Sequence, residues 1–208
     1  VKVFKHAEDV QYTNALIVVA AGWLGFVILG GLPFWITAQI TPLEIQNSFI
    51  PKGASYTIPS LIYFKNPLHC VFESMSAFTT TGLSMAVHEP SVGKTVLFYR
   101  SLASWAGGAG FIVLSLAIFK GTSGRGAILL YGSESTGEKL APRVIETSRF
   151  IWKSYVAVTF FSFLYLVIGT RMILPNYPFT ENLFDSINHA MAGICTGGFS
   201  TLDDHMAT

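Results

Sequence analysis

Long apolar runs, separated by short polar stretches, dominate the chain. Three of them, at 15–36, 92–119 and 155–174, contain few charges, which are Lys94 and Arg100 in the second and Arg171 in the third. The first has about 22 residues, which as a helix spans roughly 33 Å, and the hydrocarbon core of a bilayer is ~30 Å thick. We therefore predict three membrane-spanning helices over these ranges.

Two shorter stretches, the apolar 68–78 and the more polar 182–194, have a different length and ending. Each is too short to cross a bilayer, and each stops at a group of Thr and Gly residues. A chain that enters a membrane and stops being helical must line water or be buried in protein. We predict two re-entrant half-helices whose C-terminal dipoles favour a cation beyond them.

The segments 72–84 (FESMSAFTTTGLS) and 188–200 (NHAMAGICTGGFS) are two copies of one sequence motif. Corresponding residues differ by 116 positions (198 − 82). The pairs that share a residue type at this offset include Met75/Met191, Thr80/Thr196, Gly82/Gly198 and Ser84/Ser200. A repeat of this kind, placed between long apolar runs, indicates that both segments line a pore.

The ends of these two segments, 79–84 and 195–200, are the candidate site. Glycine adopts positive φ readily, so successive carbonyl oxygens can point to one side and replace the hydration shell of a potassium ion. The candidate carbonyls are those of Thr79, Thr80, Thr81, Gly82, Cys195, Thr196, Gly197 and Gly198. The alternative is a helix C-cap followed by an ordinary turn, which a single Thr-Gly satisfies. Two copies at one offset favour a selectivity filter.

Composition supports membrane residence. The chain is 51% hydrophobic and 12% charged, about half the charged fraction of a soluble domain, and its mean hydropathy is +0.50. A net charge of +1 without a basic face argues against a nucleic-acid partner. Cys70 and Cys195 are interpreted as small buried residues rather than a disulfide. Ion permeation involves no covalent step, so we do not expect an enzyme or a cofactor. Membrane lipid is the expected partner of the apolar helices.

The distribution of basic residues predicts the orientation. The hydrophilic stretch 121–153 is rich in Lys and Arg, and the positive-inside rule places it in the cytoplasm. Lys2 and Lys5 place the N-terminus on the same side. The proline-rich connection 37–67 then lies outside and is expected to be irregular. A multi-pass protein of the cell (inner) membrane follows.

These elements define an all-α integral membrane protein built from repeated span, pore half-helix, filter and span units, as in potassium channels. Residues 1–120 form a first unit and 154–208 a second, which stops where its closing span is expected. One and a half units cannot enclose a pore. We expect the chain to be part of a larger pore, with a truncated, non-conducting subunit that assembles with or regulates a partner as the alternative.

Two glycine-rich stretches have competing interpretations. The stretch 132–139 (GSESTGEK) has the outline of a phosphate loop, but Glu138 separates its glycine from Lys139, and a solvated loop is the better interpretation. The small residues at 107–110 either form a hinge or let neighbouring helices approach closely. Packing is the favoured interpretation.

Glu73 and Arg100 are charges at predicted membrane depth. Such a charge costs about 2.5–3.5 kcal/mol unless it is paired or hydrated. We hypothesise that they pair behind the first filter and brace its half-helix. The alternative, that each extends separately to the outer interface, is equally compatible with the sequence.

Together these residues resemble the membrane subunit of Trk/Ktr-type potassium transporters, whose relatives include plant potassium and sodium carriers. The matching pieces are Gly22-Trp23, Leu32-Pro33-Phe34, 72–84, Arg100-Ser101, 105–113 (WAGGAGFIV), 139–147 (KLAPRVIET) and 196–200 (TGGFS). The resemblance implies four units around one potassium path, with a selectivity glycine in each filter. Gly82 and Gly198 match those glycines.

The resemblance also implies a homodimer and a cytosolic nucleotide-binding regulatory subunit. Sodium-preferring relatives have serine at the position of Gly82, so glycine favours potassium, with a sodium-permeating relative as the alternative. The constricting loop and the pore arginine belong to later units and cannot be assigned here. Whether flow is channel-like or coupled by symport stays open.

Overall fold

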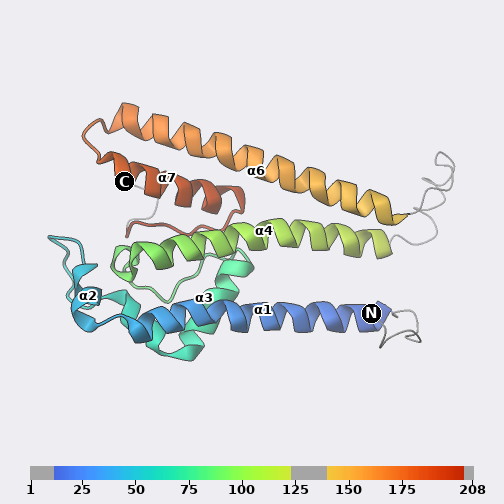
Figure 1. Ribbon diagram of the computed structural model, residues 1–208, viewed down its shortest axis with the longest axis horizontal. Coiled ribbons are helices and arrows are strands. Elements are labelled where there is room, and N and C mark those ends of the chain that lie inside the picture. Colours follow the sequence, from blue (N-terminus) through green and yellow to red (C-terminus); the bar gives the residue numbers. More distant parts are fainter. Residues whose placement is uncertain (1–11, 123–139, 204–208) are drawn as a thin grey trace.

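The computed structural model describes residues 12–122 and 140–203, and all regular structure in these ranges is helical. Three long helices, α1 (Tyr12–Ile40), α4 (Lys94–Thr122) and α6 (Leu140–Ile173), extend along the longest axis of the molecule (Figure 1). The helix α4 lies in the middle and contacts both others. This arrangement makes α4 the central scaffold.

Two shorter helices occupy the half of the molecule away from the start of α1 (Figure 1). They are α3 (Pro67–Phe78), packed on α1 and α4, and α7 (Phe179–Ile194), packed on α4 and α6. The connection after α1 contains α2 (Leu43–Ser48) and the 3-10 helix η1 (Ser60–Lys65), and a second 3-10 helix, η2 (Glu89–Val92), precedes α4. The connection expected to be irregular therefore contains helical turns.

The start of α3 is set by its local sequence. Asn66 is the N-cap, and its Oδ1 accepts a hydrogen bond of 3.0 Å from the backbone N–H of Leu68. Pro67 at the first helical position lacks only an N–H that has no partner within the helix. The Asn-Pro pair thus fixes where the short helix begins.

The first long helix continues beyond the predicted end of the span at 15–36. It contains Pro33 and ends at Ile40, because packing compensates for the hydrogen bond that proline cannot make. Phe34 is 1% exposed, and its ring centroid lies 5.4 Å from that of Phe64 in η1. The last turns of α1 are held by this core.

The third long helix begins earlier than the sequence predicts. Residues 140–153, assigned to the hydrophilic loop 121–153, form the first turns of α6. Pro142 sits in the first turn, where proline is tolerated, and charged residues such as Glu, Lys and Arg are good helix formers. Residues 123–139, which include the phosphate-loop candidate, lie outside the described residues.

A hydrophobic core beside the connection between α1 and α3 fixes α3 against the scaffold. It is formed by buried side chains from α1, η1, α3 and α4, among them Phe34, Leu61, Phe64, Cys70 and Leu97. Both cysteines are buried and neither forms a disulfide, as the sequence predicted. The core therefore positions the short helix from its N-terminal side.

Two described helical stretches are long and apolar enough to cross a membrane, Ala20–Ile40 and Ser148–Ile173. Only 22% and 6% of their apolar windows are buried, so most of these side chains face outward. The span predicted at 92–119 falls on α4, whose side chains from residue 112 onward lie outside the described part, and it stays a prediction.

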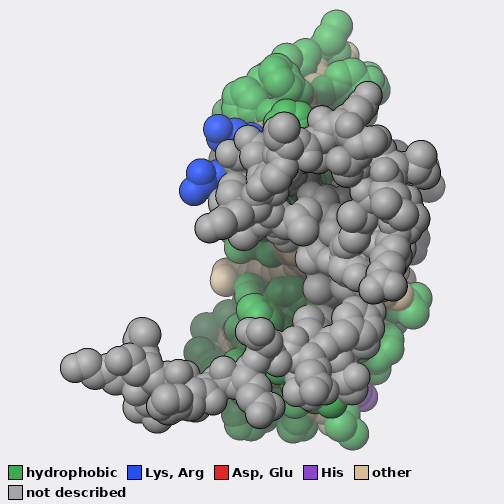
Figure 2. Space-filling model, turned by 90° about the vertical axis from the view of Figure 1, so that its right-hand side faces the viewer, with side chains coloured by type: hydrophobic (Ala, Val, Ile, Leu, Met, Phe, Trp, Pro, Cys, Tyr) green, Lys and Arg blue, Asp and Glu red, His purple; other side chains and the backbone are tan. Residues whose placement is uncertain are grey.

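Described Lys and Arg side chains are visible when the molecule is viewed from the end where α1 begins. Figure 2 looks onto this end and shows them among the described residues, with no described Asp or Glu side chain visible on that face. Arg149 and Lys153 belong to the part of α6 near this end. Lys2 and Lys5, which also entered the predicted orientation, lie outside the described residues.

Candidate functional site

Both short helices end in the same turn. After α3, the N–H of Thr80 donates to the carbonyl of Ala77 at 3.0 Å, and the N–H of Thr81 donates to the carbonyl of Ser76 at 2.9 Å. The same two bonds recur 116 positions later (196 − 80), from Thr196 to Gly193 at 3.2 Å and from Gly197 to Ala192 at 2.9 Å. This pair of bonds is the Schellman C-cap, so the turn itself is a helix-capping motif.

Residues of unusual conformation occupy this cap. The residue that needs a left-handed conformation in a Schellman cap is usually glycine, but here it is Thr80 with φ 56° and Thr196 with φ 53°. They are the only non-glycine residues with positive φ in the part of the chain that the structure describes. Two residues further on, Gly82 and Gly198 have φ of 77° and 70°. Two positive-φ residues in three distinguish these segments from an ordinary turn.

The segments 79–84 and 195–200 lie against each other. A Cβ atom added to Gly82 would stand 2.0 Å from the carbonyl oxygen of Gly197, closer than any real Cβ contact. Position 82 therefore requires glycine twice, for its positive φ and for this close approach. The two segments that the sequence singled out, 115 residues apart at this contact (197 − 82), are neighbours in space.

The middle helix α4 approaches both helix ends through glycine. A Cβ on Gly107 would lie 2.2 Å from the carbonyl oxygen of Phe78, the last residue of α3. A Cβ on Gly108 would lie 2.7 Å from the Cβ of Cys195, the C-cap of α7. Since α4 runs as one helix through 107–110, these contacts support packing rather than a hinge.

The carboxylate of Glu73 holds the end of the first segment. Its side chain is 0% exposed. One oxygen, Oε1, accepts a hydrogen bond of 2.9 Å from the hydroxyl of Ser84, and the other, Oε2, accepts one of 2.8 Å from the backbone N–H of Met85. The α3 helix is thereby tied to the point where the chain leaves the 79–84 segment.

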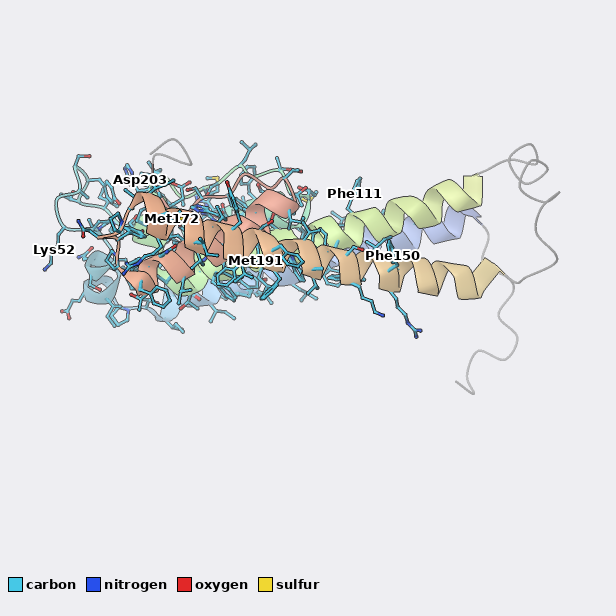
Figure 3. All side chains as sticks on the ribbon, turned by 90° about the horizontal axis from the view of Figure 1, so that it is seen from above. Lys52, Phe111, Phe150, Met172, Met191 and Asp203 are labelled. Carbon is cyan, nitrogen blue, oxygen red and sulfur yellow. The ribbon has the colours of Figure 1, made fainter. Side chains whose placement is uncertain are left out.

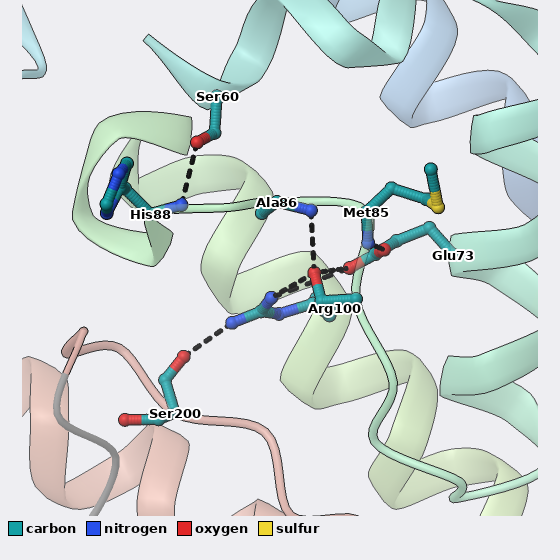
Figure 4. Close-up of polar contacts among 8 residues, drawn as sticks. Ser60, Glu73, Met85, Ala86, His88, Arg100 and Ser200 are labelled. Carbon is teal, nitrogen blue, oxygen red and sulfur yellow. Dashed lines mark hydrogen bonds and ion pairs between the residues drawn. The ribbon is translucent and has the colours of Figure 1, made fainter. Parts of the chain in front are cut away.

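The guanidinium of Arg100 joins the two segments. Its Nη1 lies 3.5 Å from Glu73 Oε1 and donates to Ser84 Oγ at 3.1 Å, and its Nη2 donates to the carbonyl oxygen of Ser200 (Figure 4). The guanidinium carbon also lies 4.5 Å from the centroid of the Phe199 ring. Arg100 is 2% exposed, so the structure has the hypothesised pair and not two side chains extending separately to the interface.

A second contact joins the residues that follow the two segments. The rings of Tyr56 and His88 are stacked with centroids 3.7 Å apart, and His88 Nδ1 lies 3.5 Å from Asp203 Oδ1. Burial raises the pKa of Tyr56, and the nearby charge of Asp203 raises it further, so its hydroxyl keeps its proton. The residues that follow both segments therefore meet beside Tyr56 in the connection between α1 and α3.

With this geometry in view, comparison with known proteins is informative. Residues 18–208 match the model of the TrkH family, described as a cation transport protein. The chain belongs to the TrkH family. The match includes both short helices and both segments that follow them. No solved structure matches the chain.

Several relatives carry names that state a transport activity. The chain is 30% identical over 97% of its length to the Trk system potassium uptake protein TrkH of Vibrio parahaemolyticus and 31% over 96% to that of Escherichia coli. It is 33% identical over 76% of its length to an uncharacterized cation transporter of Methanocaldococcus jannaschii. These alignments cover 36%, 35% and 33% of the relatives, so the chain spans about a third of their length.

For this TrkH-family chain, sequence reasoning missed three members of the site. Ser84 and Ser200 were treated as repeat markers only, yet Ser84 links Glu73 to Arg100, and the Ser200 carbonyl accepts from Arg100. Asp203, three residues beyond the second segment, lies with its Oδ1 3.5 Å from His88 Nδ1. The shared offset of 116 positions (200 − 84) was the available signal for the serines.

The described residues contain no group of three or more His, Cys, Asp and Glu side chains that could hold a metal ion. The hydroxyl of Ser104 lies 3.1 Å from the Sγ of Cys195, and that thiol is also 3.4 Å from the carbonyl of Ala192. Side chains around the 195–200 segment therefore bond to one another and to the backbone.

Proposed function

We propose that this chain is part of a potassium-translocating membrane protein and that its 79–84 and 195–200 segments are selectivity-filter strands. Membership of the TrkH family and the names of the potassium uptake proteins among its relatives support the substrate class. The observation that carries the proposal is the conformation repeated at Thr80/Gly82 and Thr196/Gly198.

The ion-coordinating groups in this proposal are backbone carbonyls. They belong to Thr79, Thr80, Thr81, Gly82, Cys195, Thr196, Gly197 and Gly198. Positive φ at every second residue allows successive carbonyls to face one side, which an extended strand with alternating carbonyls does not. Such a row of oxygens can replace the water around a partly dehydrated potassium ion. The C-terminal ends of α3 and α7 add a partial negative charge that favours a cation.

The buried contacts behind the segments give the proposed filter its shape. Glu73 holds the exit of the first strand, and Arg100 ties that exit to the exit of the second. Because the guanidinium is paired with the Glu73 carboxylate, its charge is compensated close to a cation path. A braced pair of strands keeps the spacing of coordinating oxygens constant.

The proposal extends to location and assembly. We place α1, α4 and α6 across the cell membrane, with the Lys- and Arg-bearing end in the cytoplasm. A complete potassium path needs further pore units around the two strands described here. The homodimer and the regulatory nucleotide-binding subunit stay predictions from the family resemblance.

Replacement of Gly82 tests the assignment to potassium. In the full-length protein, produced in bacteria that lack their own potassium uptake, we expect Gly82→Ser to lower the potassium-over-sodium uptake ratio about tenfold, a change of ~1.4 kcal/mol. The added Cβ must displace the carbonyl of Gly197, one of the proposed ligands, from its place 2.0 Å away. The matched control is Gly25→Ser, since a Cβ at Gly25 has nothing within 4 Å.

The outcomes separate the competing functions. An unchanged uptake ratio in Gly82→Ser would count against the filter assignment. A wild-type protein that prefers sodium would assign the chain to a sodium-permeating relative. A full-length protein that carries neither ion would favour the non-conducting, assembly or regulatory role.

A further inference from the structure

The two strands share their backbone geometry, but the side chains that brace them differ. At the offset of 116 positions, Glu73 corresponds to His189 (189 − 73) and Met85 corresponds to Thr201. The second unit therefore has no carboxylate at the place from which Glu73 holds the first strand. Another group must hold the exit of the second strand if both are braced.

One part of the exit is the same in both units. The hydroxyl of Ser84 accepts a 3.0 Å hydrogen bond from the N–H of Ala86, and the hydroxyl of Ser200 accepts one of 3.0 Å from the N–H of Leu202. Glu73 binds the first serine at 2.9 Å, whereas His189 Nε2 lies 3.5 Å from the second. The histidine contact is thus at the outer limit of a hydrogen bond.

Asp185, one helical turn before His189 on α7, makes the stronger contacts. Its Oδ1 accepts a hydrogen bond of 2.7 Å from the hydroxyl of Thr201, and its Oδ2 accepts one of 2.5 Å from the hydroxyl of Tyr177. Thr201 is 4% exposed and follows the second strand directly. The carboxylate therefore reaches the same point of the second strand that Glu73 reaches in the first.

We infer that Asp185 is the positioning residue of the second filter strand, acting through the Thr201 hydroxyl in the way that Glu73 acts through Ser84 and Met85. This inference rests on the proposed function of the 195–200 segment. Thr201 is three residues beyond Gly198, so its hydrogen bond sets where the outermost proposed carbonyls lie. Asp185 touches no ion and acts only through the strand.

Tyr177 and its loop orient Asp185. Burial raises the pKa of Tyr177, and its hydrogen bond to Asp185 and the charge of that carboxylate raise it further, so the phenol stays protonated and donates. Arg171, in the last turn of α6, donates to the carbonyl of Pro175 at 2.9 Å and lies 3.4 Å from that of Tyr177. Hydrogen bonds therefore connect the end of α6, through the loop with Tyr177 and through Asp185, to Thr201 at the end of the second strand.

The surroundings of the two braces differ in a way that makes the second one testable. Glu73 is fully buried beside Arg100, whereas Asp185 is half-buried and, with Tyr177 and His189, borders a cavity of about 900 Å³ between α6 and α7. In Thr201→Val the Asp185 carboxylate stays half-buried beside this space and keeps its hydrogen bond from Tyr177. We therefore expect variants of this brace to fold.

Potassium uptake by the full-length protein, measured as a function of potassium concentration, tests the inference. We expect Thr201→Val and Asp185→Ala each to raise the apparent KM about fivefold, the factor for one hydrogen bond, and to change maximal uptake per molecule less. Thr201→Ser keeps the hydroxyl and should retain the wild-type KM. The double variant Asp185→Ala with Thr201→Val should match Asp185→Ala alone, because Asp185→Ala already removes the bond that Thr201→Val removes.

Glu181→Ala is the control for the loss of an acid from α7. Its carboxylate pairs with Lys94 and is not part of the contacts to the strand, so the KM should not change. A wild-type KM in Thr201→Val, equal defects in Thr201→Ser and Thr201→Val, or additive effects in the double variant would each overturn the role of Asp185. Any of these three results would overturn this inference and leave the proposed function standing, provided that the wild-type protein takes up potassium and Gly82→Ser alters its selectivity. Absence of potassium uptake by the wild type would overturn both.

Discussion

Thr80 and Thr196 show at the residue scale how a general capping motif becomes a special one. A Schellman cap with glycine in its left-handed position costs no strain, whereas a β-branched residue there is uncommon and unfavourable. The same residue type occurs at this position after both short helices, with φ of 56° and 53°. Such strain persists only where the surroundings hold the backbone, and here the contacts with α4 and between the two strands do so.

The close approach of α4 to α3 leads to a prediction about one glycine. We expect Gly107→Ala to destabilise the full-length protein by about 1–3 kcal/mol, the range for overpacking, because its Cβ would stand 2.2 Å from the carbonyl oxygen of Phe78. The measurement is the melting temperature of the purified protein in detergent.

Gly110→Ala is the matched control in the same helix. A Cβ at Gly110 meets nothing within 4 Å, and alanine is a better helix former than glycine by about 1 kcal/mol. Its melting temperature should equal or exceed that of the wild type. Equal melting temperatures for Gly107→Ala and Gly110→Ala would contradict the packing described for 107–110.

At the scale of elements, one buried ion pair connects α3, α4 and the segments 79–84 and 195–200. Glu73 comes from α3 and Arg100 from α4, and their hydrogen bonds reach the ends of both strands, at Ser84 and Ser200 (Figure 4). A buried pair contributes little net stability compared with apolar residues, but removal of one partner leaves an uncompensated charge. The pair therefore serves the relative placement of the elements.

We predict that Glu73→Gln destabilises the full-length protein by about 3–5 kcal/mol, since it leaves the Arg100 guanidinium buried without its counter-charge. The melting temperature of the purified protein measures this. The same chemical change at the exposed Glu44, in the first turn of α2, should cost less than about 1 kcal/mol. If the two substitutions lowered the melting temperature equally, the charge of Glu73 would contribute no more to stability than the charge of an exposed glutamate.

At the scale of the whole molecule, apolar faces and charges lie in separate zones. Large hydrophobic side chains are exposed along α1 and α6, as expected for helices that face lipid. The described connections between α1 and α3 and between α6 and α7 lie at the opposite end from the start of α1 (Figure 1). Figure 3 shows Lys52 at this end and Phe150 well along the molecule toward the other.

The orientation in the membrane can be measured at these two places. We predict that a membrane-impermeant maleimide labels Lys52→Cys in intact cells, and labels Arg149→Cys only after permeabilisation, because the positive-inside rule puts the α6 start in the cytoplasm. Both positions are exposed, and the native Cys70 and Cys195 are buried and add little background. The reverse labelling pattern would invert the orientation, and labelling of both in intact cells would contradict membrane insertion.

Features set by neighbouring residues could be predicted from the sequence, whereas features set by contacts between distant residues could not. The break after α3 was visible because Thr-Thr-Gly ends a helix by local backbone preference, and the structure has α3 ending at Phe78. The ends of α1 and the start of α6 were misplaced. Packing of Phe34 carries α1 past Pro33, and Pro142 is harmless in a first turn, neither of which the hydropathy pattern contains.

The sequence by itself determined the all-helical character, two apolar spans and the repeat at 116 positions, because hydropathy and glycine placement act over a few neighbouring residues. Only the tertiary structure decided that Arg100 reaches Ser200, 100 positions away, and that Gly82 lies against Gly197. It also decided that a carboxylate reaches the second strand from Asp185, one turn away from the place that the repeat indicates. Such contacts depend on how α3, α4 and α7 pack, and packing geometry is not a property of any single segment.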